Sequence, residues 1–505
     1  MKIEKAGFKT LVQRPLLVLG VLALVISIFA NNISPMAAYY RMSIVALVMA
    51  TWWVFEVLPL AATALLPIVA YPFLDIMPAK DIAPAYMSSV LMLFIGGFLV
   101  ALAMQEWNLH RRLALTVLSW FGGRPSRMLF GFMLCTFTLS MWMSNTAATV
   151  MMVSIGLALI SHFEDLASRQ SSKPEQKEEA HNISVALMLG IAYSATIGGM
   201  ATLVGTPPNL TFARTYAFNF PDKGSIGFTQ WFIFGLPVAL VIFFIAFFWL
   251  KRFFLKAETT MELPKDVIRA ELKALGPLRF EEITIMAVFF TMAFAWIFRA
   301  DLTLGALTIP GWSRLLAHGS KIDDGTVAIM MALCLFIIPA RQKKGRGILH
   351  HEVIGRIPWH TILLFGGGFA LAKGMQASGL SAYIGEKFLG AQGLPQVVFV
   401  PILTLGMSFL TEVTSNMAST EMMLPVIVSV CKSLGISAVI PMIGTTLAAS
   451  AAFMLPAATA PNAIVFGSGI VSIKDMARVG IIINFCAVLV IVLAVFFIVP
   501  LSIKL

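Results

Sequence analysis

Charged residues are scarce in this chain, and their scarcity is the first constraint on its class. Only 12% of the 505 residues are Asp, Glu, Lys or Arg, whereas 59% are hydrophobic. A soluble globular protein has about 25% charged residues, so this chain lacks the polar surface that water requires. Several apolar stretches approach the ~20 residues that cross a bilayer; they are 16–33, 232–250, 283–298 and 481–499. The sequence therefore predicts an integral membrane protein surrounded by lipid.

The alternation of apolar and polar residues that is typical of membrane-spanning strands is also missing. Strands of an outer-membrane barrel alternate over about 10 residues, and no such segment occurs. We therefore expect an all-α fold. The first apolar stretch is too long for a signal peptide and no small-residue cleavage site follows it, so we expect it to be a helix of the protein.

Signatures of several kinds of enzyme and pump are absent. The four cysteines lie far apart in apolar stretches, which indicates packing rather than a disulfide or metal site. His350 and His351 are the only neighbouring histidines; we find no metal-ligand grouping and expect neither a metalloenzyme nor a bound cofactor. The absence of a Gly-x-x-x-x-Gly-Lys-Ser/Thr motif argues against an ATP-driven pump.

The net charge of +11 does not point to nucleic acid, because the basic residues gather in short segments beside the apolar stretches. These residues are Lys2, Lys5, Lys9 and Arg14; Lys251, Arg252 and Lys256; and Arg341, Lys343, Lys344 and Arg346. Short loops rich in Lys and Arg stay on the cytoplasmic side of a membrane. We therefore expect a multi-pass protein of a bacterial inner membrane with a cytoplasmic N-terminus, and no nucleic-acid partner.

An internal repeat is the most informative pattern in the sequence. Three motifs occur twice: Leu-Phe-Ile/Gly-Gly-Gly-Phe at 93–98 and 364–369, Ser-Asn-x-Ala-x-Thr at 144–149 and 415–420, and x-Thr-x-Pro-Asn at 205–209 and 458–462. The first two pairs are 271 residues apart and the third 253 apart, which requires an insertion in the first half. We place it in the polar stretch 162–182 and expect a solvated loop there.

Duplicated halves are typical of secondary transporters, whose binding sites form where the repeats meet. One stretch of the first half is basic, with His110, Arg111, Arg112, Arg124 and Arg127. The matching stretch 381–398 has only Lys387, so we expect the halves to have opposite orientations in the membrane. The chain then divides into N-terminal scaffold helices, a first repeat, an amphipathic linker with further scaffold helices, and a second repeat: 1–85, 86–250, 251–355 and 356–505.

Both Ser-Asn motifs lie inside apolar stretches, 132–160 and 399–430. Polar groups at membrane depth are tolerated where a helix breaks and lines a cavity, and Asn favours such a break. Free amides at the start of the following half-helix attract carboxylates, whereas freed carbonyl and side-chain oxygens suit Na+. One such motif alone would indicate an interhelical hydrogen bond, but its twofold occurrence favours a binding site.

The other two motifs predict further irregular backbone. Each Pro-Asn motif predicts a second helix break in its half, because proline removes a backbone donor. The Gly-rich segments 93–98 and 364–369 would permit a tight hairpin that enters and leaves the membrane by one face. We expect that hairpin; the alternative for these glycines is close helix packing.

These paired motifs resemble those of the divalent anion/sodium symporters. That family has two Ser-Asn-Thr motifs, each with a Thr-Pro-Pro-Asn-like partner in the same half. The resemblance runs from Trp52-Trp53-x-x-Glu56 to the last apolar stretch, nearly the whole chain. It implies about 11 transmembrane helices, two re-entrant helical hairpins, two inverted repeats, and an elevator-type homodimer with scaffold and transport domains.

Specific site residues are also implied by the resemblance. One sodium site is implied at Ser140, Ser144, Asn145 and Gly205, and the second at Thr411, Thr414, Asn416 and Ala458. The implied substrate-binding residues are Asn145, Thr146, Ser415 and Asn416, with Thr206 and Thr459 nearby. Two positions depart from the family pattern: Met417 stands where Thr is expected, and Ala460 stands in place of the first proline. The lost hydroxyl at Met417 puts the size and affinity of the substrate in doubt.

Sodium-coupled symport of C4-dicarboxylates such as succinate, fumarate and malate is the function we expect, with Na+ as the coupling ion. No Lys or Arg lies in either Ser-Asn motif or either Pro-Asn motif, so a dianion needs another source of positive charge, which co-bound sodium supplies. Dicarboxylate exchange and sodium-coupled sulfate or citrate transport remain open. A channel would also use re-entrant loops, whereas an intramembrane enzyme needs a nucleophile with a base or an Asp pair, which these motifs lack.

Two acidic residues flank the second Ser-Asn motif, Glu412 and Glu421. An intramembrane carboxylate is a candidate functional group. Glu412 could orient a sodium ligand or sense protons; a structural hydrogen bond or a position facing water is the alternative. Glu56, close to Pro59, is expected to be an interfacial or packing acid.

Overall fold

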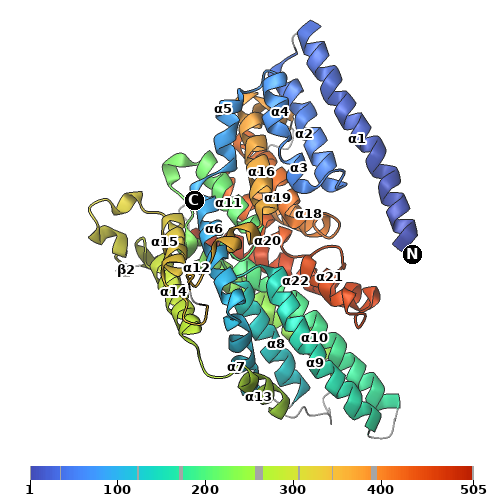
Figure 1. Ribbon diagram of the computed structural model, residues 1–505. Helices are drawn as coiled ribbons and strands as arrows, with labels where there is room; N and C mark the ends of the chain where they lie inside the picture. Colours follow the sequence, from blue (N-terminus) through green and yellow to red (C-terminus); the bar gives the residue numbers. More distant parts are fainter. Residues whose placement is uncertain are drawn as a thin grey trace.

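The computed structural model of this protein describes residues 2–33, 36–121, 124–169, 174–255, 265–304, 307–343, 345–387 and 395–502. Its elements are helices, apart from one two-stranded antiparallel ladder (Figure 1). That ladder, β1 (Leu302–Leu304) and β2 (Leu307–Ile309), is a small departure from the predicted all-α fold. It forms in the connection between two helices, so the helical architecture is unaffected.

The N-terminal region, which precedes the first repeat, consists of two long helices followed by several short ones. They are α1 (Lys2–Ile33), α2 (Ala38–Val54), α3 (Leu60–Thr63), α4 (Leu66–Phe73), α5 (Ala79–Ile82) and the 3₁₀ turn η1 (Ala83–Tyr86). Figure 1 shows α1 at the edge of the molecule beside α2. Only 17% of the apolar part of α1 is buried inside the protein, so its other side chains are available to lipid.

The two halves contain the same series of seven helices, to which η2 is added in the first half and α23 in the second. The first half consists of α6 (Ser89–Glu106), α7 (Leu109–Phe121), α8 (Pro125–Ser140), α9 (Asn145–Arg169), α10 (Pro174–Ala201), α11 (Pro207–Asn219), η2 (Pro221–Lys223) and α12 (Phe228–Phe254). The second consists of α16 (Trp359–Ala377), α17 (Leu380–Lys387), α18 (Gln396–Leu410), α19 (Asn416–Leu434), α20 (Val439–Ala449), α21 (Ala460–Gly467), α22 (Ile473–Phe497) and α23 (Val499–Ser502). The repeat in the sequence is therefore a repeat of helices.

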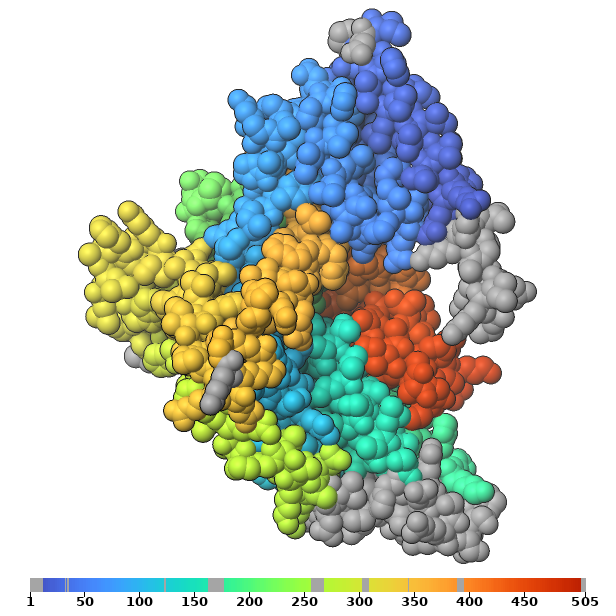
Figure 2. Space-filling model, in the orientation of Figure 1, coloured from blue at the N-terminus to red at the C-terminus, as the bar shows by residue number. Residues whose placement is uncertain are grey.

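A linker region connects these halves. Its elements are α13 (Lys265–Ala274), α14 (Phe280–Ile297), β1, β2, η3 (Trp312–Leu315), η4 (Gly319–Lys321), α15 (Asp324–Ile337) and η5 (His351–Arg356). In Figure 2 the second half (orange to red) lies between the N-terminal helices (blue) and the helices of the first half (teal).

Seven helices among the described residues are long and apolar enough to cross a membrane. They are Val12–Asn31, Ala79–Glu106, Lys177–Ala201, Phe228–Phe254, Phe280–Ile297, Asn416–Leu434 and Ile473–Phe497, and five shorter apolar helices accompany them. The multi-span helical fold is thus confirmed, whereas the expected number of about eleven spans stays a prediction.

The polar insertion of the first half lengthens two helices, which corrects the expectation of a loop. Its backbone is helical over 162–169 at the end of α9 and over 174–182 at the start of α10. Residues such as Glu, Lys, Gln and Ala dominate this stretch, and all of them favour helix.

The Gly-rich segments do not form hairpins, and this prediction is wrong. Both lie inside continuous helices, α6 and α16. A Cβ added at Gly96 would lie 2.5 Å from the Ala328 carbonyl carbon, and one at Gly367 would lie 2.5 Å from the Ala64 Cβ. These glycines therefore serve the alternative function of close helix packing. The helices are broken instead at the Ser-Asn motifs, between α8 and α9 and between α18 and α19.

Packing is reciprocal, both of the halves against the regions outside them and of the halves against each other. Helix α6 of the first half packs against α15, and α16 of the second half packs against α3 and α4. Likewise α11 packs against α19 and α20, while α21 packs against α9 and α10. Each half thus contributes a short helix to the other, which is the relation that a twofold axis produces.

A glycine pair tests the packing argument. We expect Gly96→Ala to lower stability by about 1–3 kcal/mol, because the new methyl group overlaps the α15 backbone. Gly406→Ala in α18 should instead raise it by about 0.5–1 kcal/mol, because a Cβ added there has open space within 4 Å. Thermal unfolding of the detergent-solubilised variants measures both; equal shifts of the same sign would contradict the assignment.

Candidate functional site

Both Ser-Asn motifs lie at breaks between two helices, as predicted. Helix α8 ends at Ser140 and α9 begins at Asn145; α18 ends at Leu410 and α19 begins at Asn416. The backbone in between forms a tight turn, so four or five residues leave the helical hydrogen-bond ladder in each half. Such residues need other partners inside an apolar bundle.

In the first half, a buried serine gathers oxygen atoms around the turn. Ser140 is 0% exposed, and its Oγ lies 2.6 Å from both Asn145 Oδ1 and the Ala195 carbonyl oxygen. One hydroxyl proton serves two acceptors, so three oxygen atoms lie close together around the Ser140 side chain. Oxygen ligands gathered in this way are what a hard cation requires.

The second half repeats this cluster at matching positions. Thr411 is also 0% exposed. Its Oγ1 lies 2.5 Å from Asn416 Oδ1 and 2.8 Å from the Ala449 carbonyl oxygen. The sequence predicts the hydroxyl and the carboxamide of each cluster. It does not predict Ala195 or Ala449, because every residue has a backbone carbonyl and none is marked by residue type.

Each Pro-Asn motif follows a second break, again as predicted. Helix α10 ends at Ala201 and α11 begins at Pro207; α20 ends at Ala449 and α21 begins at Ala460. The interruption in the second half is therefore the longer one, spanning 450–459. Irregular backbone of this length exposes several carbonyl and amide groups to the interior of the protein.

The asparagines of the Pro-Asn motifs bridge these breaks, a role that the sequence analysis missed. Asn209 Nδ2 donates to the carbonyls of Gly199 (3.1 Å) and Thr202 (2.8 Å). Asn462 Nδ2 donates to the carbonyls of its half, Ala452 at 3.3 Å and Leu455 at 3.0 Å. The acceptors keep the offset of 253 residues, so the two bridges are equivalent. The sequence held one signal for this role, because both Asn residues lie at the same distance after the break that they bridge.

All four breaks border one cavity of about 910 Å³. Most predicted site residues line it: Ser144, Asn145, Thr146, Gly205, Thr206, Thr414, Ser415, Asn416, Ala458 and Thr459. The two that do not are Ser140 and Thr411, which lie behind the asparagines that they contact. The structure thus brings residues that are far apart in the sequence to the wall of a single cavity.

Four helix N-termini meet at this cavity. Residues of the first turns of α9, α11, α19 and α21 line it, represented by Asn145, Pro207, Asn416 and Ala460. Because each N-terminus carries a partial positive charge, together they favour an anion. The lining residues include no Lys or Arg; Glu56 and His360 are the ionisable residues among them.

Both departures from the family pattern lie at the cavity wall. Met417 lines it and is 7% exposed, so a thioether stands where a hydroxyl was expected. Ala460 occupies the first position of α21, where the first half has Pro207. Unlike proline, alanine keeps a backbone N–H at this helix start, which adds a donor near the cavity.

The three acidic residues have different surroundings. Glu56 is exposed and lines the cavity, which differs from the expected interfacial or packing position. Glu421 is 4% exposed and accepts a hydrogen bond of 2.8 Å from Thr211 Oγ1, which joins α19 to α11. Glu412 is 3% exposed and is hydrogen-bonded to a helix break, so it does not face water.

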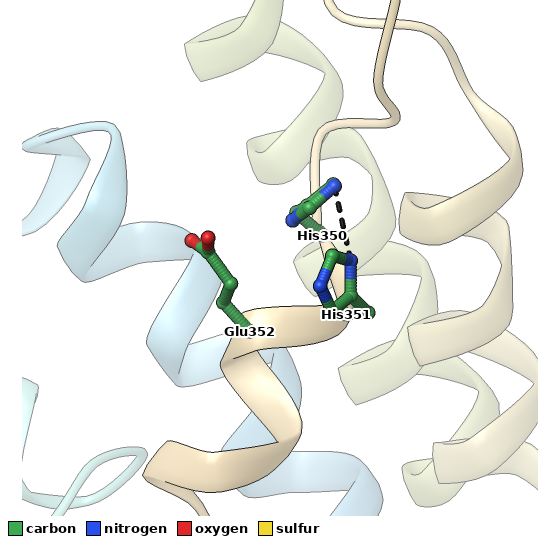
Figure 3. A group of neighbouring side chains, drawn as sticks. All are labelled: His350, His351 and Glu352. Carbon is green, nitrogen blue, oxygen red and sulfur yellow. Dashed lines mark hydrogen bonds between the residues drawn. The ribbon is translucent and has the colours of Figure 1, made fainter.

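One side-chain group among the described residues has the composition of a metal site, although none was expected from the sequence. His350, His351 and Glu352 place one ligand atom each within 4.8 Å of one another. Figure 3 shows the two imidazoles against each other and the Glu352 side chain extending to one side. His351 Nδ1 and His350 Nε2 are 3.1 Å apart and bond to each other. The group lies away from the cavity lining, and the three residues are consecutive, so we assign it no function.

A cavity among broken helices, inside a multi-span bundle with repeated halves, defines a membrane transport protein rather than an enzyme. The family described as "Sodium:sulfate symporter transmembrane region" matches residues 9–503. The chain belongs to this family.

Similar proteins cover nearly the whole chain. It is 38% identical over 489 residues to the sodium-dependent dicarboxylate transporter SdcS of Staphylococcus saprophyticus, covering 96% of this chain and 91% of that protein. The protein of the same name from Staphylococcus aureus strain MRSA252 is 38% identical over 490 residues, with the same coverage.

Two solved structures share the fold. The YdaH transporter of Alcanivorax borkumensis matches with a TM-score of 0.53 at 14% identity, covering 89% of this chain and 97% of that one. MtrF of Neisseria gonorrhoeae matches with a TM-score of 0.53 at 12% identity, covering 82% of each chain. At these identities the likeness concerns the arrangement of helices alone.

Removing one hydroxyl tests the oxygen clusters. Thr411→Val keeps the side-chain volume but leaves Asn416 Oδ1 without its donor, so we expect a loss of about 1–3 kcal/mol in stability. Thr411→Ser keeps the hydroxyl and is the matched control. Thermal unfolding without sodium distinguishes them; equal melting temperatures for the two variants would contradict the assigned hydrogen bonds.

Proposed function

We propose that this protein is a secondary active transporter that couples Na+ to the uptake of C4-dicarboxylates such as succinate, fumarate and malate. The observation that carries the proposal is the pair of matched oxygen clusters, Ser140 with Asn145 and Thr411 with Asn416, at the wall of one cavity. Relatives that are 38% identical over nearly the whole chain and bear the name sodium-dependent dicarboxylate transporter support the choice of ion and substrate.

The charges of the cavity favour coupled transport. A dicarboxylate carries two negative charges, and the lining residues offer no Lys or Arg to balance them. Helix N-termini contribute roughly half a charge each at most. Two bound sodium ions supply the remainder, so anion binding depends on prior or simultaneous cation binding.

Each site asparagine can link the two ligands through its carboxamide. Oδ1 of Asn145 faces the buried oxygen cluster, where it accepts from Ser140 in the absence of a cation. When Oδ1 coordinates Na+, the Nδ2 group of the same carboxamide remains a donor for a substrate carboxylate. Asn416 has the same arrangement with Thr411. One planar group therefore contacts both the ion and the anion, which couples their affinities.

The sodium ligands in this proposal are those implied by the family. The first site consists of Ser140, Ser144, Asn145 and Gly205, and the second of Thr411, Thr414, Asn416 and Ala458. The substrate contacts are Asn145, Thr146, Ser415 and Asn416, with Thr206 and Thr459 nearby. Their common position around the cavity supports this assignment.

Transport by an elevator movement of inverted repeats is the proposed mechanism. The reciprocal packing of α11 and α21 on the opposite halves supports the twofold relation of the repeats. In this mechanism the two hairpins, α8–α9 and α18–α19, move with the site as a transport domain. The N-terminal helices and the linker helices act as scaffold in a homodimer of the bacterial inner membrane, with cytoplasmic N-termini.

Radiolabelled succinate uptake into proteoliposomes, with and without an inward sodium gradient, tests the function. Strong stimulation by sodium, with competition by fumarate and malate, is the expected result. Uptake that needs internal succinate but no sodium would identify an exchanger instead. A lack of succinate uptake under both conditions would refute the proposed substrate and redirect the assay to sulfate and citrate.

Replacing a site asparagine should abolish uptake without unfolding the protein. We expect Asn145→Ala or Asn416→Ala to lower sodium-stimulated succinate uptake by about 100-fold or more, because each removes a ligand of both the ion and the anion. Size-exclusion chromatography of the same samples reports on folding. Normal transport by both variants would show that the site lies elsewhere.

Met417→Thr restores the hydroxyl that the family pattern contains at this position. We expect a change of about 3- to 10-fold in the KM for succinate, or in the preference between succinate and citrate, from one added hydrogen bond. The sodium dependence should stay the same. A change in sodium dependence alone would instead assign this position to the cation site.

A further inference from the structure

Glu412 is a buried carboxylate with an unusual number of hydrogen-bond donors. It follows Thr411 directly in the chain and is 3% exposed. Its Oε1 accepts from the backbone N–H groups of Phe453 (2.8 Å) and Met454 (3.0 Å), and its Oε2 accepts from that of Leu455 (3.0 Å). These three consecutive amides all belong to the break between α20 and α21. Glu412 therefore binds the interrupted segment 450–459 through its backbone.

The last helix contributes to the same arrangement. Asn484 of α22 donates its Nδ2 to Glu412 Oε1 at 2.7 Å, and its Oδ1 accepts from the Phe453 N–H at 3.1 Å. An added Cβ at Gly480, one turn earlier, would overlap the Phe453 carbonyl. The Tyr193 ring of α10 packs edge-on against Phe453, with centroids 5.3 Å apart. Two helices, α22 and α10, and the turn that carries Glu412 thus hold the start of the segment that ends at the cavity-lining residues.

The first half lacks this charge at the matching position, which is Met141. There the contact is reversed, because the Thr202 hydroxyl donates to the Met141 carbonyl. Near the first break, Trp231 of α12 donates its indole N–H to the Met200 carbonyl at 3.0 Å. Among the described residues, the first break is held by neutral groups and the second by a carboxylate, although the two oxygen clusters are alike.

Bringing a carboxylate into a membrane protein is costly, so its surroundings must satisfy it. Four donors converge on Glu412 and satisfy both of its carboxyl oxygens in this buried position. Thr411, the neighbouring residue in the chain, belongs to the second oxygen cluster. Glu412 therefore ties the backbone beside this cluster to the segment 450–459.

We propose that Glu412 is a positioning residue for the second cation site. It fixes the segment 450–459, which carries Ala458 and Thr459 to the cavity, and this fixed backbone makes the second site bind Na+ more tightly than the site of the first half. The two sites are then unequal despite their matching ligands, and the second fills first as sodium rises. This inference rests on the proposed sodium coupling.

Glu412→Gln tests these hydrogen bonds with little change in shape. We expect the sodium concentration for half-maximal succinate uptake to rise about tenfold, because the new NH₂ group faces other donors and the segment 450–459 loses part of its anchor. The KM for succinate at saturating sodium should change less than about twofold, since Glu412 does not line the cavity. A purely structural role would lower maximal uptake and stability but leave the sodium midpoint in place.

A second readout separates this inference from the proposed function. Sodium-dependent thermal stabilisation of the detergent-solubilised protein reports cation binding without succinate. If the wild-type protein is stabilised by sodium but takes up no succinate, the substrate proposal fails and the sodium midpoint of Glu412→Gln still decides the role of Glu412. If sodium stabilises the wild type and Glu412→Gln with the same midpoint, the role of Glu412 is refuted. If sodium neither stabilises the wild type nor stimulates its uptake, both proposals are refuted.

Two further variants guard against misfolding and general effects. Asn484→Ala keeps the Glu412 carboxyl group and removes one of its donors, so we expect the sodium midpoint to rise about threefold. This variant tests the proposal if Glu412→Gln does not fold. An unchanged sodium midpoint in Asn484→Ala would then overturn the proposal. Glu421→Gln is the matched control, since Glu421 is also buried on this hairpin but is bonded to Thr211. Its sodium midpoint should stay within about twofold of the wild type, and an equal rise in both acid variants would refute a specific role for Glu412.

Discussion

Every part of this site depends on one constraint: a broken helix inside an apolar bundle must find partners for its free backbone groups within the protein. Four helices are broken around the cavity, and each break is held by a specific side chain. Ser140 and Thr411 bind carbonyls of the helix that leads to the second break of their half, while Asn209 and Asn462 bridge the breaks that precede them. The groups that hold the helix breaks therefore also set the positions of the oxygens and amides around the cavity.

The two halves satisfy this constraint with the same geometry but with partly different side chains. The hydroxyl and carboxamide of each oxygen cluster keep their offset, and so do the asparagine bridges. Elsewhere the halves diverge: Met141 is matched by Glu412, whose carboxyl group is hydrogen-bonded to the longer break of the second half. The two oxygen clusters are therefore alike, whereas the groups that support them differ.

Some of this could be read from the sequence and some could not. The helix breaks were predictable because Asn and Pro disfavour helix within apolar stretches, and the structure has breaks at all four motifs. The prediction of hairpins at the glycines was wrong, because a Gly-rich segment suits a turn and a close helix contact equally well. Only the positions of Ala328 and Ala64, which are distant in the chain, show that Gly96 and Gly367 serve contacts. The prediction of a loop at the charged insertion was wrong for a similar reason. Its polarity indicates exposure to water but does not distinguish a loop from the lengthened end of a helix.

The sequence by itself determined the membrane location, the helical class, the duplication and the residue types of the site, because composition and spacing are properties of the chain alone. The tertiary structure decided which distant groups meet. Ala195 and Ala449 became cluster members through their carbonyls, which every residue has and no motif reveals. The partners of Glu412 were equally hidden, because three backbone amides converge on one carboxylate only after α20, α21 and α22 have packed around it.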